Sequence, residues 1–308
     1  MDDRLLRTAR SLGGVFCSGD AHRLGIDDQD VDRLVGRGEV VRVRRGTFIV
    51  SESLQRATPE AAFALRVKAV LRARGETVAA SHQAALALHG LPLHRVDLSH
   101  VDLVAEVRRH RTKAGVTTHP DRGVAVVWVD GWRAVCVSSA LVQVAASSGL
   151  ASGVVAMDAA LQRGACTRSE LGHAAASLPL RFAGAARRAV ERIDSRSESV
   201  GESLARLLLV DLGFSVVSQV DLRDALGSLV GRVDLLVDDW VVVEFDSAVK
   251  YGGADGREAL VAEKRRESRL VELGYEVVRL TWADLENPAE VVRRIRAAQA
   301  RVLLRRPA

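Results

Sequence analysis

The chain has 308 residues, of which 48% are hydrophobic and 27% charged, which is the composition of a globular protein large enough for two or three domains. It contains no apolar run of the roughly 18 residues that a membrane span requires, and its three scattered cysteines have neither zinc-ligand spacing nor the even count of a disulfide framework. The net charge of +5 is compatible with a nucleic-acid partner without establishing one, and the N-terminus lacks a signal-peptide core, so we expect a cytoplasmic protein that binds no membrane.

Residues 1–75 show the pattern of three short helices followed by a basic hairpin at residues 39–50. This order predicts a winged helix-turn-helix domain, in which the third helix enters the major groove of DNA and the hairpin contacts phosphates. The expected phosphate contacts are Arg42, Arg44 and Arg45. The third helix, however, begins with the acidic run DDQDVD, so a small helical domain that packs against protein is the alternative.

Residues 76–194 alternate between helical and strand-like segments, which predicts a middle α+β domain. An alanine-rich helix is expected over VAASHQAALALHG, followed by strands within residues 95–107 and 123–138 and then by three helices. Six histidines lie between residues 82 and 119, and none has the i,i+4 partner or the short spacing of a zinc site. They are His82, His89, His94, His100, His110 and His119. We therefore expect scattered surface or packing histidines rather than a metal cluster.

A charged, serine-rich stretch near Asp194 marks the expected start of a last domain, residues 195–308. Its pattern is a helix, three strands, a helix, a strand and a closing helix, which predicts an α/β sandwich with a mixed sheet. The second and third strands, within residues 232–237 and 240–246, are expected to form a hairpin. The whole chain is thus predicted to be an α/β multidomain protein.

Three carboxylates interrupt the apolar runs of this hairpin. Glu244 and Asp246 are two residues apart, so they project from one face of their strand. A three-residue loop would place Asp234 opposite Glu244, whereas a two-residue loop would place it across from Val243 on the other face. The alternative role of Asp234 is to pair with Arg232 or to end the strand. Converging carboxylates repel one another unless a cation lies between them, and Mg²⁺ (or Mn²⁺) prefers oxygen ligands. We therefore expect Asp234, Glu244 and Asp246 within reach of one ion that activates water for phosphodiester hydrolysis.

Further residues near these acids are candidates for the same chemistry. Lys250, four residues beyond Asp246, could orient the nucleophile or neutralise the phosphate, and the alternative is a solvated loop lysine. Glu202 lies at the start of the preceding helix, where Ser199 and Glu202 also have the spacing of a capping box. Lys264, in a helix otherwise rich in arginine, is the expected DNA contact of this domain.

The acids of the hairpin and of the preceding helix, followed by EKRRE and LGYEVVRLTW within residues 263–282, resemble the PD-(D/E)XK restriction-endonuclease-like superfamily. The closest similarity is to relatives of the very-short-patch-repair endonucleases, and it covers about the last hundred residues. The resemblance implies a restriction-endonuclease-like fold and Mg²⁺-dependent DNA hydrolysis. It implies Asp234 and Glu244 as metal ligands, Asp246 in place of the usual catalytic lysine, and Glu202 as the helix acid.

The part of the chain before this domain resembles the AbiEi-type antitoxin family, in which a winged helix precedes a domain containing a segment like SHQAALALHG. This resemblance implies a DNA-binding transcriptional autoregulator, with DNA and either a cognate toxin or a second copy of the chain as partners. Two functions are therefore expected as alternatives: a Mg²⁺-dependent DNA endonuclease with an N-terminal DNA-binding module, or a non-catalytic DNA-binding regulator with a degenerate nuclease domain. The three acids favour the first. Ser247 and Lys250, where the endonuclease relatives often have Gly and His, favour the second.

Overall fold

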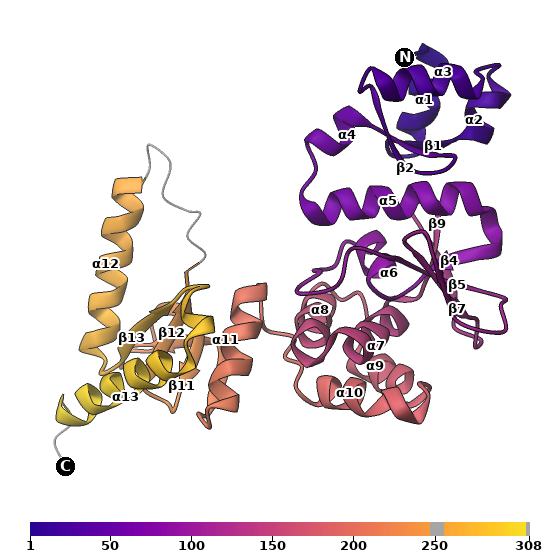
Figure 1. The fold of residues 1–308 in the computed structure, drawn as a ribbon. Helices are drawn as coiled ribbons and strands as arrows, with labels where there is room; N and C mark the ends of the chain where they lie inside the picture. Colours follow the sequence, from indigo (N-terminus) through magenta and orange to yellow (C-terminus); the bar gives the residue numbers. More distant parts are fainter. Residues whose placement is uncertain (247–255, 306–308) are drawn as a thin grey trace. The chain divides into compact units, whose positions relative to one another are not determined.

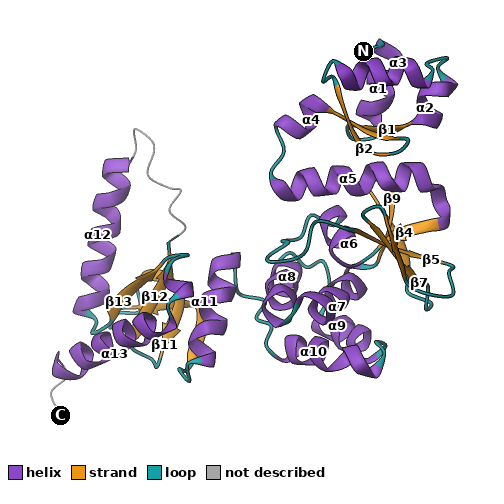
Figure 2. Cartoon of the chain, viewed as in Figure 1, coloured by secondary structure: helices purple, strands orange, loops and turns teal. Residues whose placement is uncertain are grey.

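The computed structural model describes residues 1–246 and 256–305, and within residues 180–182 and 256–263 it defines the backbone only. The chain divides into two compact units, each described separately below (Figure 1). The first unit is Met1–Ala160 with Gly164–Glu191, and the second is Leu161–Arg163 with Arg192–Ala308. Helices and strands alternate in both units, so the predicted mixed α/β character is confirmed (Figure 2). Among the described residues no helix is both long and apolar enough to cross a membrane.

The first unit begins with helices and a small antiparallel sheet in the order β1-β3-β2. Its elements are α1 (Asp3–Ser11), β1 (Val15–Cys17), α2 (Ser18–Arg23), α3 (Asp28–Gly36), β2 (Val40–Arg44) and β3 (Thr47–Val50). Asp2 caps α1, and Asp27 and Asp30 form the capping box that starts α3. The three helices and the hairpin thus form in the predicted places. The short strand β1 was not predicted, and its pairing with β3 completes a three-stranded sheet.

A long helix connects this segment to the rest of the first unit. Helix α5 (Pro59–Arg74), which follows α4 (Ser51–Gln55), packs on β1 and β3 and also on α6 (His82–Leu88), as Figure 1 shows. Arg72 on α5 donates hydrogen bonds to the buried carboxylate of Asp20 on α2, with Nε at 3.0 and 3.1 Å from its two oxygens. Burial alone would raise the pKa of Asp20, but these bonds hold it at about 2. This ion pair therefore fixes α2 against α5.

The remainder of the first unit is a six-stranded mixed sheet with helices packed beside it. The strand order is β6-β7-β5-β4-β9-β8, in which β5 pairs with β7 and β4 with β9 in parallel. The strands are β4 (Val78–Ala80), β5 (Val101–Ala105), β6 (Arg111–Lys113), β7 (Val116–Pro120), β8 (Val126–Val129) and β9 (Trp132–Val135). The helices that follow are α7 (Val137–Ser148), α8 (Leu150–Gln162), α9 (Arg168–Ala176) and α10 (Leu180–Glu191), and η1 (Gly75–Thr77) is a 3-10 turn before β4.

The second unit is a four-stranded sheet covered by helices on both faces. Its elements are α11 (Val200–Asp211), β10 (Val216–Arg223), β11 (Leu229–Val237), β12 (Val241–Phe245), α12 (Gly256–Glu272), β13 (Glu276–Leu280), η2 (Asp284–Glu286) and α13 (Pro288–Arg305). Strands β10, β11 and β12 are antiparallel neighbours, and β12 pairs with β13 in parallel, which gives the mixed sheet that was predicted. Helices α11 and α13 pack on one apolar face through Leu209 and Ile295, and α12 packs on the other through Leu270.

Candidate functional site

The hairpin of β11 and β12 has a three-residue loop, one of the two registers that its sequence allows. Val237 pairs with Val241, and the last recorded pair is Leu235 with Val243. The same register, continued by one step beyond the last pair, brings Asp234 to the level of Glu244. The loop residues Asp238 and Asp239 have φ values of 46° and 65°, a left-handed conformation that short polar side chains tolerate.

The two strands separate at the level of Asp234. Its Oδ2 accepts a hydrogen bond from the backbone N–H of Phe245 at 2.9 Å. This side-chain hydrogen bond takes the place of the next hydrogen bond between the backbones of the two strands. The ring of Phe245 is held from two sides. It packs edge-on against Trp282 with ring centroids 5.1 Å apart, and it lies so close to Gly201 that a Cβ there would clash with it. The Asp234 carboxylate is thus positioned where the hairpin opens.

Glu202 reaches the same place from α11. Ser199 caps this helix by accepting the Glu202 N–H at 3.1 Å, but the Glu202 carboxylate does not return to the Ser199 amide as a capping box would require. Its Oε2 accepts instead from the N–H of Glu198 at 2.9 Å and from Nε2 of Gln219 at 2.8 Å. Gln219 lies on β10 between the residues that pair with the neighbours of Asp234, so the buried Glu202 carboxylate faces the region of Asp234.

The acids of this region act on one another electrostatically. The pKa of Asp234 is raised to about 6, chiefly by burial and further by the negative charges of Glu202 and Glu244. The Phe245 N–H and the charge of Arg266 oppose this rise. Three carboxylates from α11, β11 and β12 therefore influence one site.

Glu244 has basic partners, although no Lys or Arg lies within five residues of it in the sequence. Arg266 on α12 forms an ion pair with Glu244 Oε1, and Nε of Arg279 on β13 lies 3.7 Å from Oε2. Both partners are far away in the sequence. Arg266 therefore draws the Glu244 carboxylate toward α12.

Asp246 and the two lysines complete the account of the predicted nuclease residues. Asp246 is partly exposed, and its backbone N–H donates to the Leu280 carbonyl at 2.8 Å. Among the described residues, Asp234, Glu244 and Asp246 do not each place an oxygen within 4.8 Å of the other two, so the expected convergence of this set is not seen. Repulsion of like charges and the pull of the arginines on Glu244 account for the spread. Lys264 is exposed on α12, and Lys250 lies outside the described residues.

The three arginines predicted to contact DNA differ in their surroundings. Arg42 forms an ion pair with Asp32 of α3 and lies over the Phe48 ring. Arg44 is half-buried, and burial together with the charge of Arg74 lowers its pKa. Arg45 is exposed at the turn between β2 and β3. Of the three, Arg45 is exposed and lies in the turn itself, outside both strands.

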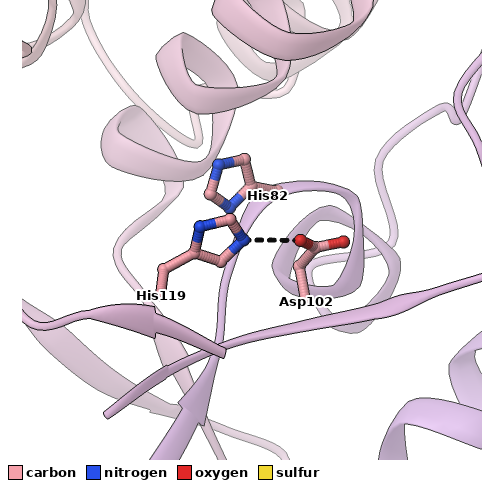
Figure 3. Close-up of side chains that lie close together, drawn as sticks. All are labelled: His82, Asp102 and His119. Atoms are coloured by element: carbon pink, nitrogen blue, oxygen red, sulfur yellow. Dashed lines mark hydrogen bonds and ion pairs between the residues drawn. The ribbon is translucent and has the colours of Figure 1, made fainter. Parts of the chain in front are cut away.

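The prediction of scattered histidines is wrong for part of the middle segment. His82, Asp102 and His119 each offer one ligand atom, and these atoms lie within 4.8 Å of one another (Figure 3). His119 Nε2 and Asp102 Oδ1 are 2.6 Å apart, and the rings of His82 and His119 stack at 4.3 Å. The His110 ring also stacks on the His119 ring, with the two ring centroids 5.1 Å apart. Asp102 and His119 lie on the parallel neighbours β5 and β7, a pairing that no local sequence pattern reveals.

Comparisons with known proteins identify the N-terminal segment. Residues 3–51 match the model of a family described as "Transcriptional regulator, AbiEi antitoxin". The match runs from α1 through β3, so this segment is a domain of the AbiEi antitoxin type, and the predicted resemblance is confirmed there. It does not reach the middle segment or the carboxylates of the second unit.

Similarity to curated proteins extends over most of the chain. Two relatives from Mycobacterium tuberculosis are named "Uncharacterized protein MT2308", from strain CDC 1551 / Oshkosh, and "Uncharacterized protein Rv2248", from strain ATCC 25618 / H37Rv. Each is 28% identical over 270 residues, which is 87% of this chain and 95% of the relative. The similarity to these relatives thus covers nearly their whole length.

Proposed function

We propose that the protein is a DNA-binding protein whose second unit is a Mg²⁺-dependent (or Mn²⁺-dependent) DNA endonuclease of the PD-(D/E)XK type. The observation that carries this proposal is the position of Asp234, at the opening of the hairpin and under the influence of both Glu202 and Glu244. A buried acid whose pKa is raised by burial and neighbouring carboxylates is typical of functional sites.

The donor set fits a hard divalent cation. Asp234 and Glu244 supply carboxylate oxygens, which Mg²⁺ prefers, and these two residues would hold the ion. Bound there, Mg²⁺ would activate water and stabilise the charge that develops on the scissile phosphate. A carboxyl with a pKa near 6 is mostly ionised at neutral pH and is therefore ready to bind a cation. Arg266, released from Glu244, would neutralise a DNA phosphate beside the site, and the exposed Lys264 on the same helix would contact the next phosphates.

The N-terminal segment would supply DNA affinity. Its order of helix, strand, helix, helix and hairpin is that of a winged helix, and its family match is to a transcriptional regulator. Arg45 in the turn of the hairpin is placed to contact a phosphate. The acids in the first turn of α3 limit close approach of that end, so we assign affinity chiefly to the hairpin and to non-specific phosphate contacts. Such a function fits the expected cytoplasmic location.

A second candidate is a non-catalytic DNA-binding regulator, and a specific observation favours it. Arg266 and Arg279 neutralise Glu244 without any metal, as in a structural ion-pair network. In this case the chain would repress transcription through its AbiEi-type segment, with a cognate toxin or a second copy as partner. Asp234 and Glu244 would then contribute only to the stability of the second unit.

Cleavage and binding by one variant separate the two candidates. Asp234→Asn keeps the size of the side chain and an acceptor for the Phe245 N–H, but it removes the charge that would hold the cation. We expect this variant to lose Mg²⁺-dependent cleavage of duplex DNA and to keep the wild-type DNA affinity measured in EDTA. The control is Asp221→Asn, an exposed position on β10, which should retain both. A wild type and an Asp234→Asn variant that bind DNA equally and cleave none would leave the regulator as the function.

A further inference from the structure

A cavity in the first unit contains a group of residues that the proposed nuclease does not use. The cavity has a volume of about 690 Å³ and is lined by parts of β5, β7, α7, α9 and the loops around residues 108–110 and 122–125. His82 and His119 lie in its wall, and Asp102 is hydrogen-bonded to His119 beside it (Figure 3). The group therefore faces a space in which a small ligand fits.

The donor atoms of this group suit a transition-metal ion. Two imidazoles and one carboxylate are a common ligand set for Zn²⁺ in sites that keep a position open for a further ligand, whereas Mg²⁺ prefers oxygen alone. Zn²⁺ bonds of about 2.0–2.2 Å require ligand atoms within roughly 4.4 Å of one another. The atoms of His82, Asp102 and His119 already lie within 4.8 Å, so small side-chain rotations suffice.

Two of the three ligand side chains, those of His82 and Asp102, are each oriented by a further hydrogen bond, as metal ligands usually are. Nδ1 of His82 lies 3.1 Å from the Ser81 hydroxyl, which directs the other ring nitrogen away from Ser81. Gln83 Nε2 donates to Asp102 Oδ2 at 2.6 Å, which leaves Oδ1 directed at His119.

The backbone at His82 is held in an uncommon conformation. His82 has a φ of 50°, and its N–H donates to Gln143 Oε1 at 2.9 Å. A non-glycine residue in this region costs roughly 1–3 kcal/mol and persists where its surroundings hold it. The hydrogen bond from the His82 N–H to Gln143 on α7 is such a restraint, and it keeps the imidazole at the cavity wall.

The cavity is basic as well. Arg108, Arg109 and Arg122 line it, and no Asp or Glu belongs to its described lining. Across the part of the chain that the structure describes, no ion pair is recorded for any of these three arginines. Exposed arginines around a cavity attract anions, and a bound cation would strengthen this attraction.

From these observations we propose that His82, Asp102 and His119 bind a divalent transition-metal ion of the Zn²⁺ class, whose open position faces the basic cavity and takes an anionic ligand of the phosphate type. Binding replaces the hydrogen bond between His119 and Asp102: His119 Nε2 offers its lone pair to the metal, and the neutral ring then carries its proton on Nδ1. This site is independent of Asp234 and Glu244, so it stands or falls separately from the nuclease proposal.

Metal binding by the full chain tests the site. Calorimetric titration with Zn²⁺ in excess Mg²⁺, which occupies carboxylate sites, should show one ion per chain. His119→Gln and Asp102→Asn should each weaken binding by about tenfold or more. His100→Gln, which removes an exposed histidine paired with Asp97, is the control and should bind as the wild type does. Equal affinity in wild type, His119→Gln and Asp102→Asn, or no binding by the wild type, would overturn the proposal.

A spectroscopic measurement covers the case in which a variant fails to fold. Wild-type protein loaded with Co²⁺ should show the visible absorption of a four-coordinate ion with nitrogen ligands, and inorganic phosphate should change that spectrum. Arg108→Gln with Arg109→Gln should weaken the phosphate effect severalfold without altering Co²⁺ binding. A spectrum of fully hydrated, six-coordinate Co²⁺ would refute the metal site, and a four-coordinate spectrum that phosphate does not change would refute the anionic ligand.

Discussion

Replacing Asp234 by Asn should stabilise the second unit in a pH-dependent manner. The pKa of Asp234 is raised from 3.8 to about 6, mainly by burial and then by Glu202 and Glu244. A folded-state pKa above the unfolded value means that the charged form opposes folding. The cost is fully present above about pH 6, and it is relieved as the pH falls through 6 toward 3.8 and the carboxyl is protonated.

The size of the effect follows from the pKa values. At about 1.4 kcal/mol for each pH unit, a rise from 3.8 to about 6 corresponds to at most about 3 kcal/mol in the free energy of unfolding. Because Asp234 is only partly buried, solvent screening reduces this to about 1–2 kcal/mol. Asp234→Asn removes the charge and keeps an acceptor for the Phe245 N–H, so the variant should gain that amount near pH 8.

Scanning calorimetry of wild type, Asp234→Asn and Asp221→Asn measures the gain. The transition of the second unit should rise by about 4 °C or more in Asp234→Asn near about pH 8, and the difference should fall to about a third of that near about pH 4.5. Asp221→Asn, on the exposed side of β10, should follow the wild type at both pH values. A gain of equal size at both pH values, or a loss of stability near pH 8, would refute the claim that Asp234 is strained by burial and like charge.

Three further changes test other parts of the account. Arg45→Ala should flatten the slope of log DNA affinity against log salt concentration by about 0.9, the value for one phosphate contact, and an unchanged slope would exclude the hairpin turn from DNA binding. Glu244→Gln should lower the free energy of unfolding by about 1 kcal/mol or more because its arginine partner on α12 loses an ion pair, and calorimetry showing a gain would contradict this. Gly201→Ala should cost about 1–3 kcal/mol by driving a methyl group into Phe245. Gly172→Ala on α9, which meets open space, should be neutral or stabilising, and equal effects of the two would contradict the contact.

Periodicity and capping residues predicted many helices and strands of this chain, but they missed helix α5 and strands β6 and β7, and they placed β4 (Val78–Ala80) in a helix. Strand β1 escaped because three residues carry no period, and it exists as a strand only through β3. The hairpin at Asp234 shows a second limit. Its two registers differ by one loop residue, and the apolar pattern on both sides tolerates either. The three-residue loop is fixed in part by Asp238, whose carboxylate accepts from the Ser215 N–H and from Gln299 Nε2, and these partners come from other elements.

The candidate site residues of the second unit stay predictions from the sequence, and the partners of Glu244 were not predicted. Glu244 has no basic neighbour in its strand, whereas α12 and β13 bring Arg266 and Arg279 to it across the fold. The group of His82 and His119 depends on the strand order β7-β5-β4, in which β5 pairs with β7, two strands further along the chain. Such contacts follow from topology, which local patterns of charge and hydrophobicity do not encode.

Cleavage of supercoiled plasmid DNA by the wild-type protein tests the central claim most directly. The account predicts nicked and linear products in Mg²⁺ or Mn²⁺ and intact plasmid in EDTA, because Asp234 and Glu244 bind the ion that activates water. Intact plasmid in either metal, at protein concentrations at which the DNA is fully bound, would contradict it.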